Sequence, residues 1–211
     1  MSSFDSNIGG GHFSRVYAEG LRYFMGQGSL NNTLARLVAD LKEHDIDYMV
    51  IDAVALLAHG YPRFTEDIDL LMTREGLQKF HEELIGLGYA PAFPGAKKKL
   101  RSTIDGISIE VMTTGEYPGD GKPKPVSMPD PVSASTDIKG IRYVTLEKLI
   151  ELKLASGISA PHRLKDLADV QELIKIKKLD AEFADKLDPY VRAKYLELQD
   201  AVSKSEQIEE Q

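Results

Sequence analysis

Two aspartates, Asp67 and Asp69, lie two positions apart inside the apolar run 67–72. Successive side chains of a β-strand point to opposite faces, so a strand over 67–72 would point both carboxylates to one face. Carboxylates that close repel each other unless a cation or a proton lies between them. Mg²⁺ prefers carboxylate oxygens and retained waters as ligands. The spacing therefore predicts a magnesium site.

Glu110 is the third acidic candidate, because a strand over 107–111 would place Ser108 and Glu110 on one face. On a strand next to 67–72, Glu110 would complete a cluster of three acids able to hold two magnesium ions. Two such ions could bridge a nucleotide's phosphates and activate an attacking hydroxyl. Alternatively, Glu110 faces water on a half-exposed strand.

Lys153 lies on the apolar stripe of a helix expected from Thr145, at i+7 from Leu146. An unpaired buried ammonium is costly, so this side chain needs a partner or a route to water. It either extends past its neighbours into solvent or pairs with an anion, a carboxylate or a phosphate.

The next helix, with a start expected at Ser159/Pro161, carries Arg163, Asp166 and Asp169 at intervals of three. That spacing favours an ion pair between Arg163 and Asp166 within the helix. Asp169 could instead orient Lys153 or an attacking group.

Basic residues are clustered in two loops, although the chain as a whole is acidic. They are Lys97, Lys98, Lys99, Arg101, Lys122 and Lys124. They either form a solvated face or overhang the acidic cluster, where they would neutralise a triphosphate. His59 and Arg63 precede the aspartates and could reach a phosphate, but His59 could equally pack and cap its own helix.

The pattern of apolar residues predicts the elements that must position these groups. Helices are expected at about 32–44, 53–58 and 75–87, and strands at 48–51, 67–72 and 107–111, the last after a hairpin turn at Asp105-Gly106. Thr73 is expected to cap the helix at 75–87, and Gly88 to end it. Residues 113–140 show no periodicity, and from Thr145 the pattern is helical. A short helix around 15–25 is also expected.

Composition excludes several classes of protein. The 211 residues carry a formal charge of −7 and no cysteine, which excludes disulfides and thiolate zinc sites and argues against broad nucleic-acid binding. No apolar run approaches the roughly 18 residues that a membrane-spanning helix needs, and nothing near the N-terminus resembles a signal peptide. The sequence predicts a cytoplasmic protein without a membrane partner.

The segment His59-Gly60-x-x-Arg63-x-Thr65-x-Asp67-x-Asp69 resembles the DNA polymerase β-like nucleotidyltransferase superfamily. Together with the segments 151–157 and 163–170, it is similar to the small prokaryotic branch of this superfamily that includes AbiEii-type toxins. The resemblance covers about residues 32–175. It implies an α/β (α+β) fold, a mixed sheet flanked by helices, followed by a C-terminal helical domain. The expected division is an extension at 1–30, an α/β domain at 31–140 that includes the loop 113–140, and a helical domain at 141–211.

The resemblance also implies roles for the candidate residues. Asp67 and Asp69 would bind Mg²⁺, Glu110 would be the third ligand or the base, and Lys153 would touch the triphosphate. The other nucleotide-binding positions would be Asp52, Ala53, His59, Arg63, Thr65, Asp166 and Asp169. The implied reaction transfers a nucleoside monophosphate from a nucleoside triphosphate to an acceptor hydroxyl of RNA, protein or a small molecule, and releases pyrophosphate. A toxin-like role would add an antitoxin partner.

Asp52-Ala53 departs from the family pattern, which has Gly-Gly or Gly-Ser where backbone N–H groups cradle the phosphates. Asp52 would bring a negative charge toward the triphosphate. It could serve as the N-cap of the following helix or as an added metal ligand. The departure favours a second interpretation, a catalytically degenerate relative that binds a nucleotide or a protein partner.

Overall fold

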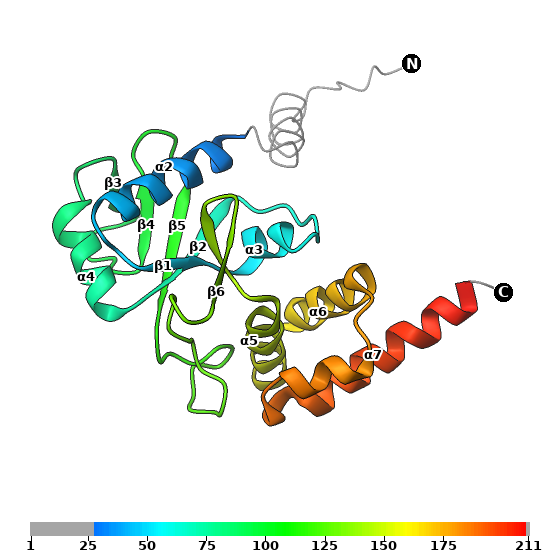
Figure 1. Ribbon diagram of the computed structural model, residues 1–211. Helices are drawn as coiled ribbons and strands as arrows, with labels where there is room; N and C mark the ends of the chain where they lie inside the picture. The colour runs from blue at the N-terminus through cyan, green and yellow to red at the C-terminus, as the bar shows by residue number, and fades with distance from the viewer. Residues whose placement is uncertain (1–27, 210–211) are drawn as a thin grey trace, which may run out of the picture.

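The computed structural model describes residues 28–209. Its architecture is α/β, with a mixed parallel and antiparallel sheet flanked by helices (Figure 1). Seven strands form one sheet in the order β3-β4-β5-β2-β1-β7-β6. They are β1 (Tyr48–Val50), β2 (Asp67–Met72), β3 (Tyr89–Pro91), β4 (Lys99–Ser102), β5 (Ser108–Thr113), β6 (Ser135–Ile138) and β7 (Ile141–Val144). The helices are α2 (Ser29–Glu43), α3 (Asp52–Ala58), α4 (Arg74–Glu83), α5 (Leu146–Ser159), α6 (Leu164–Lys177), the 3₁₀ helix η1 (Ala181–Lys186) and α7 (Pro189–Glu209). The helix expected around 15–25 lies outside the described residues.

Strand β2 lies in the middle of the sheet and has the predicted bounds. It runs antiparallel to β1 and parallel to β5. All of its residues after Asp67 are buried, because neighbouring strands and helices cover both faces. A central strand buried on both faces is held rigidly, so the carboxylates it carries are fixed in position.

The helices of the N-terminal half pack against this sheet, α2 and α3 on β2 and α4 on β5. The predicted stripe of α2 is buried, with Leu34, Leu37, Val38 and Leu41 all in the core. Thr73 caps α4 as predicted, its hydroxyl accepting a hydrogen bond from the N–H of Gly76 at 2.9 Å. The helix ends at Glu83, earlier than predicted, and the chain turns through glycines with positive φ, among them Gly86 at 91°.

Residues 113–140 are not a single aperiodic loop, which corrects the sequence prediction. Strand β6 lies within this range, and β6 and β7 form a hairpin that pairs with β1 at the sheet edge. The turn residues Lys139 and Gly140 have φ values of 55° and 82°, as the tight turns of two-residue hairpins require. Lysine is not a usual residue in that position, and four-residue strands carry little periodicity, so the pattern missed the hairpin.

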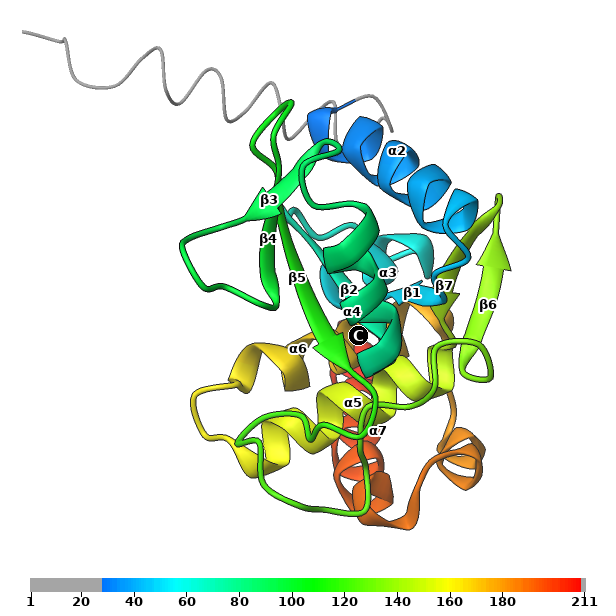
Figure 2. The same ribbon diagram turned by 90° about the vertical axis from the view of Figure 1, so that its left-hand side faces the viewer.

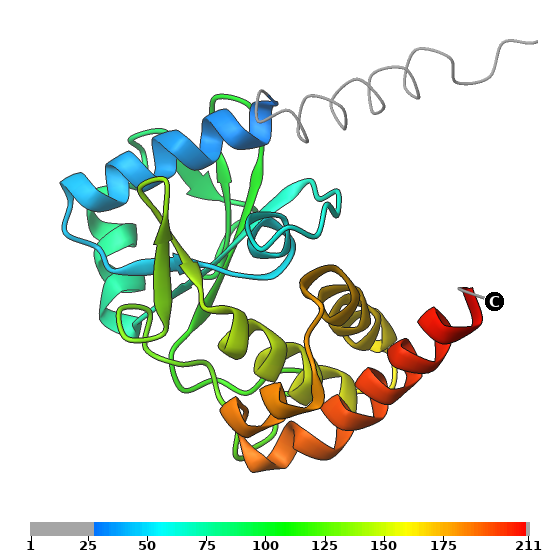
Figure 3. The ribbon, with the colours of Figure 1, turned by 45° about the vertical axis from the view of Figure 1, so that its right-hand side comes forward.

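Helices α5, α6 and α7 gather beyond one side of the sheet, as Figures 2 and 3 show from two directions. Helix α5 begins directly after Thr145, the predicted start, and Thr145 caps it; the helix continues to Ser159, so α6 starts at Leu164 rather than at Ser159/Pro161. A Cβ atom added to Gly157 would lie 2.5 Å from the side chain of Leu167. The glycine thus permits the close approach of α5 and α6 that brings Lys153 to Asp166 and Asp169.

None of the helices within residues 28–209 combines the length and the apolar character needed to cross a membrane.

Candidate active site

Three carboxylates meet on two neighbouring parallel strands. Asp67 and Asp69 are the first and third residues of β2, and the register pairs Asp69 with Glu110 and Asp67 with Ser108 on β5. Residues paired in this way point to the same face of a sheet. The hydroxyl of Thr65 donates a hydrogen bond to a carboxylate oxygen of Asp67. The structure therefore brings these three acids together, as the alternation of residues suggested.

Asp69 is buried beside the other two acids. The residue is only 6% exposed, and burial, followed by the charges of Asp52, Asp67 and Glu110, raises its pKa to about 8. A buried carboxylate among other carboxylates is stabilised either by a proton or by a cation. Hard oxygen donors are the ligands that Mg²⁺ takes, so the donor set fits this ion.

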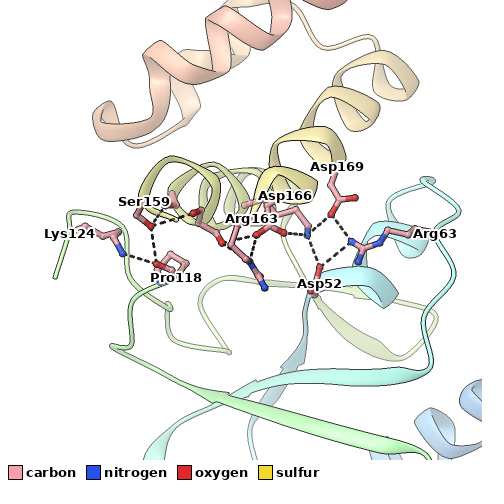
Figure 4. Close-up of polar contacts among 11 residues, drawn as sticks. Asp52, Arg63, Pro118, Lys124, Ser159, Arg163, Asp166 and Asp169 are labelled. Atoms are coloured by element: carbon pink, nitrogen blue, oxygen red, sulfur yellow. Dashed lines mark hydrogen bonds and ion pairs between the residues drawn. The ribbon is translucent and has the colours of Figure 1, made fainter. Parts of the chain in front are cut away.

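Lys153 is the centre of a second cluster, and Figure 4 labels its partners Asp52, Asp166 and Asp169. Its side chain is 5% exposed, and its Nζ lies 2.6 Å from Asp52, 2.7 Å from Asp169 and 3.1 Å from Asp166. Lys153 is thus paired with carboxylates and does not extend to solvent. Burial alone would lower the pKa of Lys153, but the charges of Asp52, Asp166 and Asp169 outweigh it and hold this pKa above its ordinary value.

Two arginines complete this Lys153 cluster. The guanidinium of Arg63 lies 2.6 Å from Asp169 and 3.6 Å from Asp52. Arg163 pairs with Asp166 at 2.8 Å, which confirms the ion pair expected within α6. The hydroxyl of Ser156 also donates to Asp166 at 2.7 Å. Asp169 orients Lys153, one of the two roles that the sequence left open.

The two clusters differ in what they can bind. Among the residues that the structure describes, Asp52, Asp166 and Asp169 have carboxylate oxygens within 4.8 Å of one another, the spacing of a metal site, whereas Asp67, Asp69 and Glu110 do not form such a group. However, the ammonium of Lys153 contacts all three members of the first group. Lys153 therefore supplies the cation in the first group, whereas the nearest lysine to the strand carboxylates, within the part of the chain that the structure describes, is Lys99 at 3.6 Å from Glu110.

Asp52 is not the N-cap of α3, which corrects one of the two roles considered for it. The N-cap is Ile51, and Asp52 is the first helical residue, with φ at 50°. Few residues other than glycine adopt this left-handed conformation, and Asp and Asn are the least strained of them. Burial would raise the pKa of Asp52, but the charges of Lys153 and Arg63 lower it below its ordinary value.

A cleft of about 620 Å³ lies over the strand carboxylates. Its lining includes Asp67, Asp69 and Glu110 together with the cations Arg63, Arg163 and Lys165. A second cavity of about 280 Å³ adjoins it, lined by α5 and by the segment 116–119, and shares Asp52 with the cleft. Sequence reasoning gave Lys165 no role, because its spacing carries no signal of its own.

The other basic loop residues do not line the cleft. Lys98 pairs with Glu116. Lys124 lies 2.6 Å from both the Asp120 carboxylate and the Pro118 carbonyl. A local carboxylate neutralises each of these lysines. The cleft instead draws its positive charge from Arg63 and the start of α6.

Of the remaining predicted positions, Ala53 and Thr65 line the cleft, but His59 is not brought there. His59 is the C-cap of α3, its ring is buried, and its Nε2 lies 2.8 Å from the Val144 carbonyl. Burial lowers the pKa of His59 below its ordinary value. This is the packing and capping role that the sequence allowed as an alternative.

Replacing Asp69 by asparagine should stabilise the metal-free protein at pH 8 but barely at pH 4. The pKa of Asp69 is about 8 in the folded protein and 3.8 unfolded. Between these values the folded state binds the additional proton, so the free energy of unfolding of the wild type falls as pH rises. Melting in EDTA should show an advantage of the variant that grows with pH and reaches roughly 3 °C or more. An advantage that is equal at both pH values would contradict this.

No protein-family model and no curated protein matches this chain. Among solved structures, it resembles a proposed nucleotidyltransferase from H. pylori, with 16% identity over 82% of this chain and 91% of the other and a TM-score of 0.44. It also resembles ANT(2")-Ia in complex with adenylyl-2"-tobramycin, with 15% identity, coverage of 82% and 97% and a TM-score of 0.48.

A third structure is a proposed nucleotidyltransferase from Thermotoga maritima, with 19% identity over 70% of this chain and 89% of the other and a TM-score of 0.40. These three identities lie between 15 and 19%. The side chains of this chain itself, rather than those of its neighbours, therefore decide what its site can do.

Proposed function

We propose that this chain is a Mg²⁺-dependent nucleotidyltransferase, which moves a nucleoside monophosphate from a nucleoside triphosphate to an acceptor hydroxyl. One observation carries the proposal. Asp67, Asp69 and Glu110 share one face of two parallel strands, under a cleft of about 620 Å³ that also exposes Arg63, Arg163 and Lys165. Carboxylates for a metal and cations for phosphates are the two groups that transfer of a phosphoryl group needs.

The residues divide the work as follows. Asp67 and Asp69 would hold the cation, which would supply charge neutralisation for the phosphates and activation of the attacking hydroxyl. Glu110 is either a third ligand or the base that takes the proton of the acceptor hydroxyl. Arg63, Arg163 and Lys165 offset the charge of the triphosphate. The acceptor oxygen bonds to the α-phosphorus as the bond from that phosphorus to the β-phosphate oxygen breaks, and pyrophosphate leaves.

The resemblance of the sequence motifs to the AbiEii-like branch supports a narrower form of this proposal. In that form the protein is a cytoplasmic enzyme of the AbiEii-like branch, with a toxin-like role and an antitoxin partner. Its acceptor would be RNA, a protein or a small molecule.

One observation favours a second candidate function, a degenerate protein that binds a nucleotide or a protein partner without chemistry. Lys153 contacts three carboxylates at 3.1 Å or less, so in this arrangement its positive charge is already neutralised and does not attract a phosphate. The two candidates differ in whether a nucleotide is consumed.

The experiment compares triphosphates labelled at the α- and at the γ-phosphate. Purified protein is incubated with Mg²⁺, each labelled triphosphate, and cell RNA or lysate. Movement of the α-label to an acceptor, with the γ-label released as pyrophosphate, is expected. Transfer of the γ-label instead would indicate a kinase. Absence of any transfer, together with a rise in melting temperature on adding nucleotide, would favour the degenerate protein.

A further inference from the structure

Asp52 occupies a position where one oxygen atom faces two cations. Its Oδ1 lies 2.6 Å from Nζ of Lys153 and 3.6 Å from the guanidinium of Arg63. We propose that Asp52 is an internal competitor of the substrate, whose carboxylate fills a phosphate subsite between Lys153 and Arg63 and must be displaced when a polyphosphate binds. The phosphate subsite belongs to the cleft for which nucleotidyl transfer is proposed, so this inference rests on that function.

Charge in the Lys153 cluster is balanced only when Asp52 is counted. Lys153, Arg63 and Arg163 face the carboxylates of Asp52, Asp166 and Asp169. Without Asp52, three cations would face two carboxylates, which leaves one excess positive charge for an incoming anion. Opposite charges a few ångströms apart near a protein surface interact by several kcal/mol before desolvation costs.

Of the three carboxylates, Asp52 is the one that a ligand can replace. Its side chain is 24% exposed, against 1% for Asp166 and 5% for Asp169. Asp52 also lines both the cleft and the adjoining cavity. Asp166 and Asp169 do not line the cleft, and each is held closely by a second cation, Arg163 at 2.8 Å and Arg63 at 2.6 Å respectively. The second cation of Asp52 is farther away, at 3.6 Å. A phosphate arriving through the cleft therefore meets Asp52 first.

The backbone conformation at Asp52 is one that only a few residue types adopt without strain. Its φ of 50° is a conformation that costs free energy for a residue with a side chain. Asn tolerates this conformation about as well as Asp, and Gly adopts it without strain. Asp52→Asn and Asp52→Gly therefore remove the charge while the turn between β1 and α3 keeps its shape.

The test measures binding of inorganic tripolyphosphate by calorimetry, without divalent cations, to the wild type, Asp52→Asn and Asp52→Gly. Both variants should bind at least about tenfold more tightly than the wild type, since removal of one close negative charge is worth at least that factor. Asp47→Asn is the matched control. It removes the same charge and a 2.7 Å ion pair with Arg142 outside the cleft, and should bind as the wild type does.

Unchanged or weaker binding by both Asp52 variants would overturn the inference, provided that their melting curves show folded protein. Should Asp52→Asn fail to fold, Asp52→Gly decides. The result is separable from the proposed function. Tighter tripolyphosphate binding without transfer of α-label by any form would leave the subsite in place and remove the enzyme. Transfer by the wild type without tighter binding in the variants would do the reverse.

Discussion

Replacing Asp67 or Asp69 by asparagine should lower the rate of α-label transfer by roughly a thousandfold. The metal that these carboxylates are proposed to hold would stabilise the charge of the transition state by several kcal/mol, and each 1.4 kcal/mol is about a factor of ten in rate. Asparagine keeps the shape of the side chain but removes the charge that would bind the ion. Single-turnover assays with a saturating triphosphate would measure the loss.

Melting temperatures distinguish this loss of transfer rate from unfolding of the variant. Asp69→Asn should melt no lower than the wild type, because the substitution removes a buried carboxyl group whose pKa is raised to about 8. Mn²⁺ should raise the melting temperature of the wild type but not that of the double variant Asp67→Asn/Asp69→Asn. Asp47→Asn should transfer label at the wild-type rate. Wild-type rates in the β2 variants would show that the strand carboxylates are not the catalytic site.

Replacing Lys153 by methionine should lower the free energy of unfolding by about 3 kcal/mol, or roughly 6–12 °C in melting temperature. The change strands the buried carboxylates of Asp166 and Asp169, which are 1% and 5% exposed. Arg163 and Arg63 still pair with them, so we expect the lower end of the range for a broken buried ion pair.

The control is a lysine in an exposed ion pair. Lys204 on α7 is 70% exposed and pairs at 2.6 Å with Asp200, which is 62% exposed, so Lys204→Met should cost no more than about 1 kcal/mol. Adding Asp166→Asn to Lys153→Met removes one stranded charge and should restore part of the loss. If Lys153→Met melts within 2 °C of Lys204→Met, roughly the effect of an exposed pair, then the buried carboxylates do not depend on this lysine for stability.

Some features of the site follow from local spacing. The alternation in 67–72 predicted the bounds of β2 and the common face of Asp67 and Asp69, because the side-chain period of a strand is a property of the backbone alone. The i,i+3 spacing likewise predicted the Arg163–Asp166 pair. The place of Lys153 on an apolar stripe predicted that it needs an anion or a route to water, and the cost of a buried charge is the reason.

Other features depend on which distant segments meet, and no local pattern contains that information. The register that sets Glu110 beside Asp69 joins residues on separate strands, and the pair between Lys153 and Asp52 joins residues 101 positions apart. Asp52 looked like a helix cap, but the left-handed turn and the approach of α5 made it an ion-pair partner. The sequence alone determined which carboxylates share a face. The approach of α5 and α6 to Asp52 and Arg63 decided which cations the carboxylates of the site would face, because ion pairs form between groups that the fold brings within a few ångströms.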